Sequence, residues 1–174
     1  MANPVHLAKR FFGAVIPRGP SAANAAWAVE QLLPGEVELW LRMSRADRRH
    51  AAGVARRVQE TLQADATRPV LAAALLHDVG KVDAGLGTYG RVIATLSAMA
   101  IRHDPAVIKA WTKTTGMTRR VGLYLQHPRL GGDMLALAGA HTLTESWARE
   151  HHLPEAEWTV EPAIARALKD ADDD

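Results

Sequence analysis

No cysteine occurs among the 174 residues of the chain. This absence excludes disulfide bonds, thiolate zinc sites and cysteine nucleophiles, so any bound metal must be held by nitrogen and oxygen donors. Long hydrophobic runs are missing as well, because the longest early one, residues 11–16, is too short to span a bilayer or to form the core of a secretion signal. We therefore expect a soluble cytoplasmic protein that does not enter a membrane.

A strong excess of either charge is also missing. Lysine and arginine together number 21 and aspartate and glutamate 19, which gives a formal net charge of +2. Proteins that bind nucleic acid through its phosphates carry a clustered basic surface, and this balance does not indicate one. We accordingly expect no nucleic-acid partner.

Strand-like alternation is almost absent, and no internal repeat or linker divides the chain. Apolar residues recur instead at helical spacing, as at positions 51, 54, 55 and 58. The sequence predicts one all-α bundle of roughly six to nine helices, with residues 37–174 as one globular unit and residues 1–36 as a helical extension packed on it. The expected helices cover residues 21–33, 37–43, 47–58, 70–79, 91–100, 106–112, 121–125, 143–150 and 162–168, and a further helix is expected to begin at Met134-Leu135.

Residues 85–90 match the glycine pattern of dinucleotide-binding folds. That pattern indicates such a fold only between a strand and a helix, whereas here it follows a predicted helix. We expect a flexible connection that leads into the next helix. A second interpretation, in which its backbone amides contact a substrate phosphate, stays open.

The pair His77-Asp78 stands at the end of an alanine- and leucine-rich run. Two ionisable groups at the end of a buried helix need partners, and a metal ion is our working hypothesis. Neighbours on a helix point about 100° apart, so both side chains can reach a cation between them. Lys81 falls on the same face, where it can hold an anionic substrate, and Gly80 leaves room for a close approach or a helix end.

A second histidine-aspartate pair, His103-Asp104, serves as an internal control. It precedes Pro105 and has no apolar run before it, so we expect a surface turn or a helix N-cap there.

Other histidines occur at positions that become informative only together. His50 falls on the inward side of its predicted helix, where a lone histidine is more often a core residue bonded to backbone. His127 is expected at a helix end because Pro128 follows it, and His151-His152 is expected at the end of the next helix. Thr142 and Glu145 predict a capping box, with His141 exposed beside it.

This set of residues resembles the HD-domain metal-dependent phosphohydrolase superfamily, over about residues 37–174. The segment His77-Asp78-x-Gly80-Lys81, preceded by Ala-Leu-Leu, is typical of that family. The segments His127-Pro128-x-x-Gly131 and His151-His152 resemble the additional ligands of its binuclear branch. The resemblance implies an HD-domain-like helical bundle that binds divalent metal.

The resemblance also implies which residues hold the ions. His50, His77, Asp78 and a final aspartate would form one site, Asp78 would bridge to a second, and His127, His151 and His152 would complete the second. Asp172, in an Ala-Asp pair, fits the family pattern better than Asp170, which stays as the alternative. The implied ions, one or two per chain, are manganese, iron or another first-row metal, and magnesium is also compatible.

The activity implied by the resemblance is hydrolysis of a phosphomonoester or phosphodiester, such as a nucleotide, by a metal-bound hydroxide. Asp78 and Lys81 are the expected catalytic residues, with Lys81 stabilising charge on the phosphate. No Gly-Tyr-Pro follows His152, which disfavours a cyclic di-guanylate substrate. A catalytically silent nucleotide-binding or regulatory module and a helical interaction domain remain as alternatives, and the oligomeric state is left open.

Overall fold

The computed structural model describes residues 19–173, which form helices and connecting turns without a strand. The all-α prediction is therefore confirmed. The apolar patch at residues 11–16 lies outside the described residues, as do the rest of residues 1–18 and Asp174. The α-helices are α2 (Ala22–Glu30), α3 (Pro34–Arg42), α4 (Arg45–Leu62), α5 (Arg68–Leu76), α6 (Lys81–Ala84), α7 (Thr88–Ala100), α8 (Pro105–Thr112), α9 (Gly116–Leu125), α10 (His127–Leu137), α11 (Thr142–Glu150) and α12 (Pro162–Asp173), and the short 3₁₀-helices are η1 (Gln63–Asp65) and η2 (Glu155–Glu157).

Helix α5 lies at the centre of the main hydrophobic core. It begins after Thr67, with Pro69 in its first turn as predicted, and every residue from position 70 to 76 is buried. A helix that is apolar on all sides is stable only when other elements cover it. Helices α3, α4 and α11 pack against it, and α4 buries Ala51, Val54, Ala55 and Val58, which confirms the predicted stripe.

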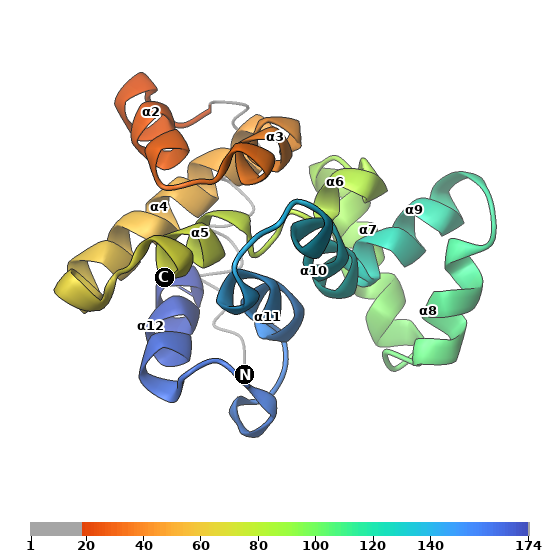
Figure 1. Ribbon diagram of the computed structural model, residues 1–174. Helices are drawn as coiled ribbons and strands as arrows, with labels where there is room; N and C mark the ends of the chain where they lie inside the picture. The colour runs from red at the N-terminus through yellow and green to blue at the C-terminus, as the bar shows by residue number, and fades with distance from the viewer. Residues whose placement is uncertain (1–18, 174) are drawn as a thin grey trace.

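Residues 19–173 form two hydrophobic cores of unequal size. The larger is formed by α2 to α5 together with α10 to α12, and it includes the tryptophans Trp40 and Trp147. The smaller lies among α6, α7 and α9 and is made of Ala84, Leu86, Ala94 and Val121. Figure 1 shows α7, α8 and α9 on one side of the molecule and α2 to α5 on the other, with α10 between them.

A helix ends just before Pro128, as predicted, but the next helix begins sooner than expected. Helix α9 ends at Leu125, and α10 begins at His127, so residues 129–133 are helical. The first turn of a helix tolerates proline because an N–H there has no partner within the helix. His127 is thus the first residue of a helix.

Two smaller expectations are also wrong. The connection at residues 85–90 is shorter than expected, because α7 already begins at Thr88. The capping box of Thr142 and Glu145 does not form, since His141 is the N-cap and its Nδ1 accepts the N–H of Leu143 at 3.1 Å. The control pair behaves as predicted, with Asp104 capping α8 and accepting the N–H groups of Ala106 and Val107.

None of the helices within residues 19–173 is both long enough and apolar enough to cross a membrane.

Candidate metal centre

The pair His77-Asp78 lies where the buried helix α5 ends. His77 caps the helix, and the backbone N–H of Lys81 donates to the carbonyl oxygen of Asp78 in the turn that follows. Only 1% of the surface of His77 and 5% of that of Asp78 are exposed. An imidazole and a carboxylate therefore stand together in the interior.

Gly80 lets α10 approach this turn closely. A Cβ atom on Gly80 would lie 2.0 Å from the carbonyl oxygen of His127 and 2.6 Å from the amide nitrogen of Gly131. No side chain fits there, because both neighbours are backbone atoms. The close approach expected of Gly80 is confirmed, and it brings the first turn of α10 beside Asp78.

One cluster, which we call the α10–α11 group, comprises Asp78, His127, His151 and His152. The potential ligand atoms of these residues all lie within 4.8 Å of one another. Nε2 of His127 is 3.2 Å from Asp78 Oδ1, and Nε2 of His151 is 3.5 Å from the same oxygen. His152 is exposed at the edge of the group, with its ring centroid 5.1 Å from that of His127.

A second cluster, the α4–α12 group, comprises His50, His77, Asp78 and Asp172. Ligand atoms of His50, His77 and Asp78 again lie within 4.8 Å of one another. Oδ1 of Asp172 is 2.8 Å from His50 Nε2 and 3.5 Å from His77 Nε2. Because His77 Nε2 lies 3.5 Å from the second oxygen of Asp78, Oδ2, the Asp78 carboxylate belongs to both groups.

Backbone carbonyl groups fix the orientation of the three buried imidazoles. Nδ1 of His77, His127 and His151 each lies within hydrogen-bonding distance of the carbonyl oxygen three residues earlier, at 2.9, 2.7 and 3.0 Å. A carbonyl oxygen only accepts, so each Nδ1 carries the proton. Each Nε2 is thereby aimed at Asp78, an arrangement that commonly orients metal-binding histidines.

Four buried atoms at the centre have no hydrogen-bond partner within residues 19–173. They are Nε2 of His77, His127 and His151, and Oδ1 of Asp78. Leaving a buried polar atom unpaired costs about 1–3 kcal/mol, so such atoms need an explanation. Here all four point into one site.

A metal ion fits the donor spacing. Two donors that each lie about 2.1 Å from one ion, at angles of about 90° to 110°, are roughly 3.0 to 3.4 Å apart. The separation of 3.2 Å between Asp78 Oδ1 and His127 Nε2 falls within that range, and the separation of 3.5 Å to His151 Nε2 lies just above it. Imidazole and carboxylate donors without thiolate suit first-row divalent ions. The buried histidines and aspartates of this centre could therefore hold metal.

Both carboxylates of the centre are held in the charged form. Burial raises the pKa of Asp78, but the neighbouring Lys81 and His77 outweigh it and bring that pKa well below its ordinary value. Burial likewise raises the pKa of Asp172. The charge of His77 and a hydrogen bond from His50 outweigh this effect, so the pKa of Asp172 lies below its ordinary value. The centre thus offers two anionic donors.

The imidazoles divide into two kinds. Burial lowers the pKa of His127 and that of His151 to about 4, so both are neutral donors near pH 7. Burial also lowers the pKa of His77, but the charges of Asp78 and Asp172 outweigh it and raise that pKa to about 10. His77 must therefore release a proton before its Nε2 can bind an ion.

Lys81 lies at the edge of the centre, where it donates a hydrogen bond to Asp78 Oδ2. Its Nζ is 5.8 Å from the centroid of the Tyr124 ring. Burial lowers the pKa of Lys81, and the Asp78 carboxylate outweighs that effect and raises it. A permanent positive charge therefore stands beside the shared carboxylate.

The structure brings together every residue that the sequence singled out for the site. His50, His77, Asp78, His127, His151, His152 and Asp172 all contribute to the two groups, and Lys81 adjoins them. Asp172 is only 6% exposed and contacts His50, whereas the alternative, Asp170, is exposed to solvent. His103 and His141 lie at the surface, as expected.

Sequence reasoning missed residues that hold the centre from outside. Arg91 of α7 forms a paired salt bridge with Asp47 of α4, with Nη–Oδ distances of 2.5 and 2.6 Å. Arg57 of α4 donates to the backbone of α12, and Tyr124 accepts Nδ1–H of His127 through its carbonyl oxygen. The contacts of Arg91 and Arg57 have no signal at short sequence spacing, because each depends on which helices become neighbours, whereas Tyr124 and His127 are three residues apart.

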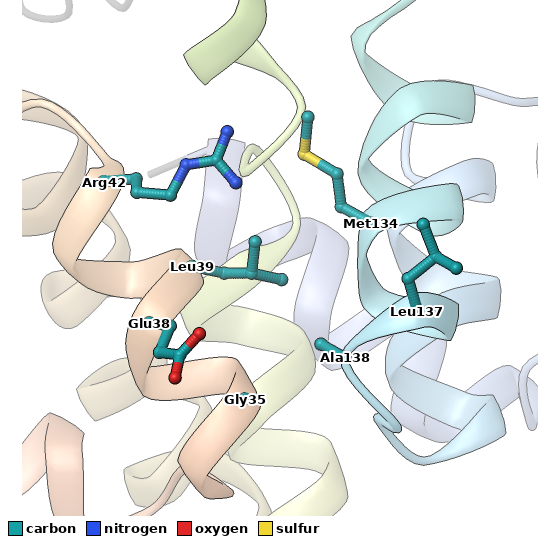
Figure 2. A pocket seen from close by; sticks show the side chains of 7 residues that line it. All are labelled: Gly35, Glu38, Leu39, Arg42, Met134, Leu137 and Ala138. Atoms are coloured by element: carbon teal, nitrogen blue, oxygen red, sulfur yellow. The ribbon is translucent and has the colours of Figure 1, made fainter.

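Two surface cavities lie apart from the candidate ligands. One of about 380 Å³ separates α3 from α10 and is lined by residues such as Leu39, Arg42 and Met134 (Figure 2). The other, of about 330 Å³, is lined by residues of α8, α10 and α11, including Ile108 and Arg149. Neither is lined by a residue of the two groups.

Comparisons of the chain with protein-family models, with curated proteins and with solved structures find no match.

Proposed function

We propose that this protein is a metal-dependent phosphohydrolase with an HD-type centre, acting on a nucleotide or a similar small phosphate in the cytoplasm. One observation carries the proposal: three buried imidazoles turn otherwise unpartnered Nε2 atoms toward a carboxylate that two ligand groups share. Divalent ions held there would acidify water and withdraw negative charge from a phosphoryl group.

The protein's own residues would bind and orient the reactants. Asp78 would hold ions on both of its oxygens, since Oδ1 faces the α10–α11 group and Oδ2 faces the α4–α12 group. Lys81 would offer its ammonium group to a phosphate oxygen, because it already lies beside Asp78 and keeps its charge. Exposed His152 marks a side of the centre that a substrate can reach.

The test is a double substitution of the central pair, with the second pair of the chain as its matched control. In His77→Ala/Asp78→Ala we expect loss of bound metal and of manganese-dependent hydrolysis of bis-p-nitrophenyl phosphate. His103→Ala/Asp104→Ala removes the same residue types from a surface cap and should keep both. Unchanged metal content in the first variant, measured on protein purified without an affinity tag, would refute the proposal.

A catalytically silent binding module is the second candidate. It is favoured by the ion pair between Lys81 and Asp78, which occupies the carboxylate oxygen that faces the α4–α12 group. A panel of nucleotides distinguishes the two: an enzyme turns one of them over, whereas a module only raises its melting temperature with the ligand.

A further inference from the structure

The last turn of α12 is a poor place for an anionic side chain. Helix α12 ends at Asp173, one residue after the candidate ligand Asp172. Carbonyl groups in the last turn have no partner within the helix, and their partial negative charge opposes a carboxylate nearby. Contacts from outside the helix stabilise this turn.

Arg57 of α4 supplies one of these contacts. Its Nε and Nη2 both donate to the carbonyl oxygen of Ala171, at 3.0 and 2.6 Å. Ala171 is 5% exposed, so this carbonyl would otherwise be short of partners in the interior. The positive guanidinium group also offsets the negative end of the helix dipole beside Asp172.

The same face of α4 also holds the side chain of Asp172. His50 precedes Arg57 by about two helical turns, so both side chains project toward α12. Nε2 of His50 contacts Asp172 Oδ1 at 2.8 Å, while Arg57 binds the carbonyl of the preceding residue, Ala171. Helix α4, which packs against α12, therefore fixes one turn of α12 at two adjacent points.

We propose that Arg57 is a positioning residue for the α4–α12 ion site, acting through Asp172 and without contacting the ion. The inference rests on the metal centre proposed above. Without Arg57 the last turn of α12 would lose both hydrogen bonds to the Ala171 carbonyl, and the contacts of Asp172 with His50 and His77 come from residues that would themselves be ion ligands. The α10–α11 site has no ligand on α4 or α12, so it should not depend on Arg57.

The experiment is a titration with Mn²⁺ as the only added ion, followed by electron paramagnetic resonance of the free ion. We expect two ions per chain in the unaltered protein. In Arg57→Met, affinity should fall about 10–100-fold at one site and stay unchanged at the other, the size typical for residues that orient metal ligands. Arg57→Lys keeps the charge but loses the paired donors. Its Mn²⁺ affinity at the α4–α12 site should therefore lie between the affinities of Arg57→Met and of the unaltered protein.

Arg56→Met is the matched control. Arg56 is the neighbour of Arg57 on α4, but it donates to Gln59 Oε1 at 3.1 Å and stacks 3.6 Å over the ring of Trp27, away from α12. Its loss removes the same charge and should leave both affinities unchanged.

A double-variant cycle separates positioning from a general structural role. If Arg57 acts through Asp172, then adding Arg57→Met to Asp172→Asn should weaken Mn²⁺ binding no further. Additive losses, equal weakening of both sites in Arg57→Met, or binding unchanged by it would overturn the inference while leaving the metal centre intact. An unaltered protein that binds no Mn²⁺ would overturn both.

Discussion

The carboxylate of Asp78 links the two groups of candidate ligands. Oδ1 lies 3.2 Å from His127 Nε2, and Oδ2 lies 3.5 Å from His77 Nε2. Asp78→Asn keeps the shape of this side chain but removes its charge, so we expect loss of both ions. His127→Gln should lose only the ion of the α10–α11 group.

Elemental analysis of the three purified proteins checks this expectation. Two ions in the unaltered protein, one in His127→Gln and close to none in Asp78→Asn would agree with a shared carboxylate. Asp78→Asn with its full metal content would show that the two groups are independent.

Lys81 is the nearest cation to the shared carboxylate, and it is not a candidate ligand. We expect Lys81→Gln to keep its metal and to lose roughly 10²–10³-fold in turnover of a phosphodiester, the size found when one charge-stabilising donor is removed. Lys109→Gln, an exposed residue of α8, is the control. Turnover by Lys81→Gln within about twofold of the unaltered protein would exclude the proposed role.

The histidines predict how stability depends on pH when metal is removed. Burial lowers the pKa of His127 and His151 to about 4. Between pH 4 and about pH 6.5 the unfolded chain therefore binds more protons than the folded protein. Over this range the free energy of unfolding falls as the pH falls. His77 acts in the opposite direction. Its two aspartate neighbours outweigh burial and raise its pKa to about 10. The contribution of His77 to the free energy of unfolding is therefore complete below about pH 6.5 and is lost as the pH rises through 10.

Urea unfolding in the presence of a chelator, at about pH 5, 7 and 9, measures this dependence. We expect the highest free energy of unfolding near neutral pH and lower values on either side. A profile without a decline between about pH 7 and 5 would contradict neutral, buried imidazoles.

Single residues were predictable from sequence where a motif fixed their chemistry. His77 and Asp78 are adjacent in the chain, and the buried run before them indicated their place. His50 and Asp172 stand 122 positions apart and contact each other, so the packing of α4 on α12 brings them together. Only the resemblance to a known ligand pattern linked them beforehand.

At the scale of helices, the contact between the turn after α5 and the start of α10 depends on glycine. A Cβ at position 80 would lie 2.0 Å from a backbone oxygen, so Gly80→Ala should cost at least about 1–3 kcal/mol and displace His127. Gly53, inside α4, has only the end of Arg57 within 4 Å, and Gly53→Ala should stabilise by about 0.5–1 kcal/mol. Urea unfolding measures the free energy of unfolding of both variants, which should change in opposite directions. Equal stability of the two variants would show that the close approach of α10 to Gly80 is unimportant.

Helix boundaries were less predictable than helix positions. The positions of α4 and α5 were predictable from their apolar residues. Helix α4 buries one side, and α5 is buried at every residue from position 70 to 76. A helix does end just before Pro128, at Leu125, but the next one begins already at His127, because proline also suits the first turn of a helix. The early start of α10 accompanies its contacts with α11 and with Gly80 in the turn after α5, which the local sequence does not reveal.

At the scale of the whole molecule, the candidate centre joins segments from most of the chain. Helices α4, α10, α11 and α12 and the turn after α5 each supply ligands, so only the complete fold of the larger core assembles them. An all-helical class follows from periodicity, whereas this convergence follows from the packing of helices that are distant in sequence.

The most direct test is X-ray diffraction from crystals grown with Mn²⁺, with anomalous data collected to locate the ions. The account predicts two anomalous peaks on either side of Asp78, one about 2.0–2.3 Å from Nε2 of His127 and His151 and the other at that distance from Nε2 of His77. Crystals without a peak beside Asp78, or with manganese only at surface carboxylates, would contradict it.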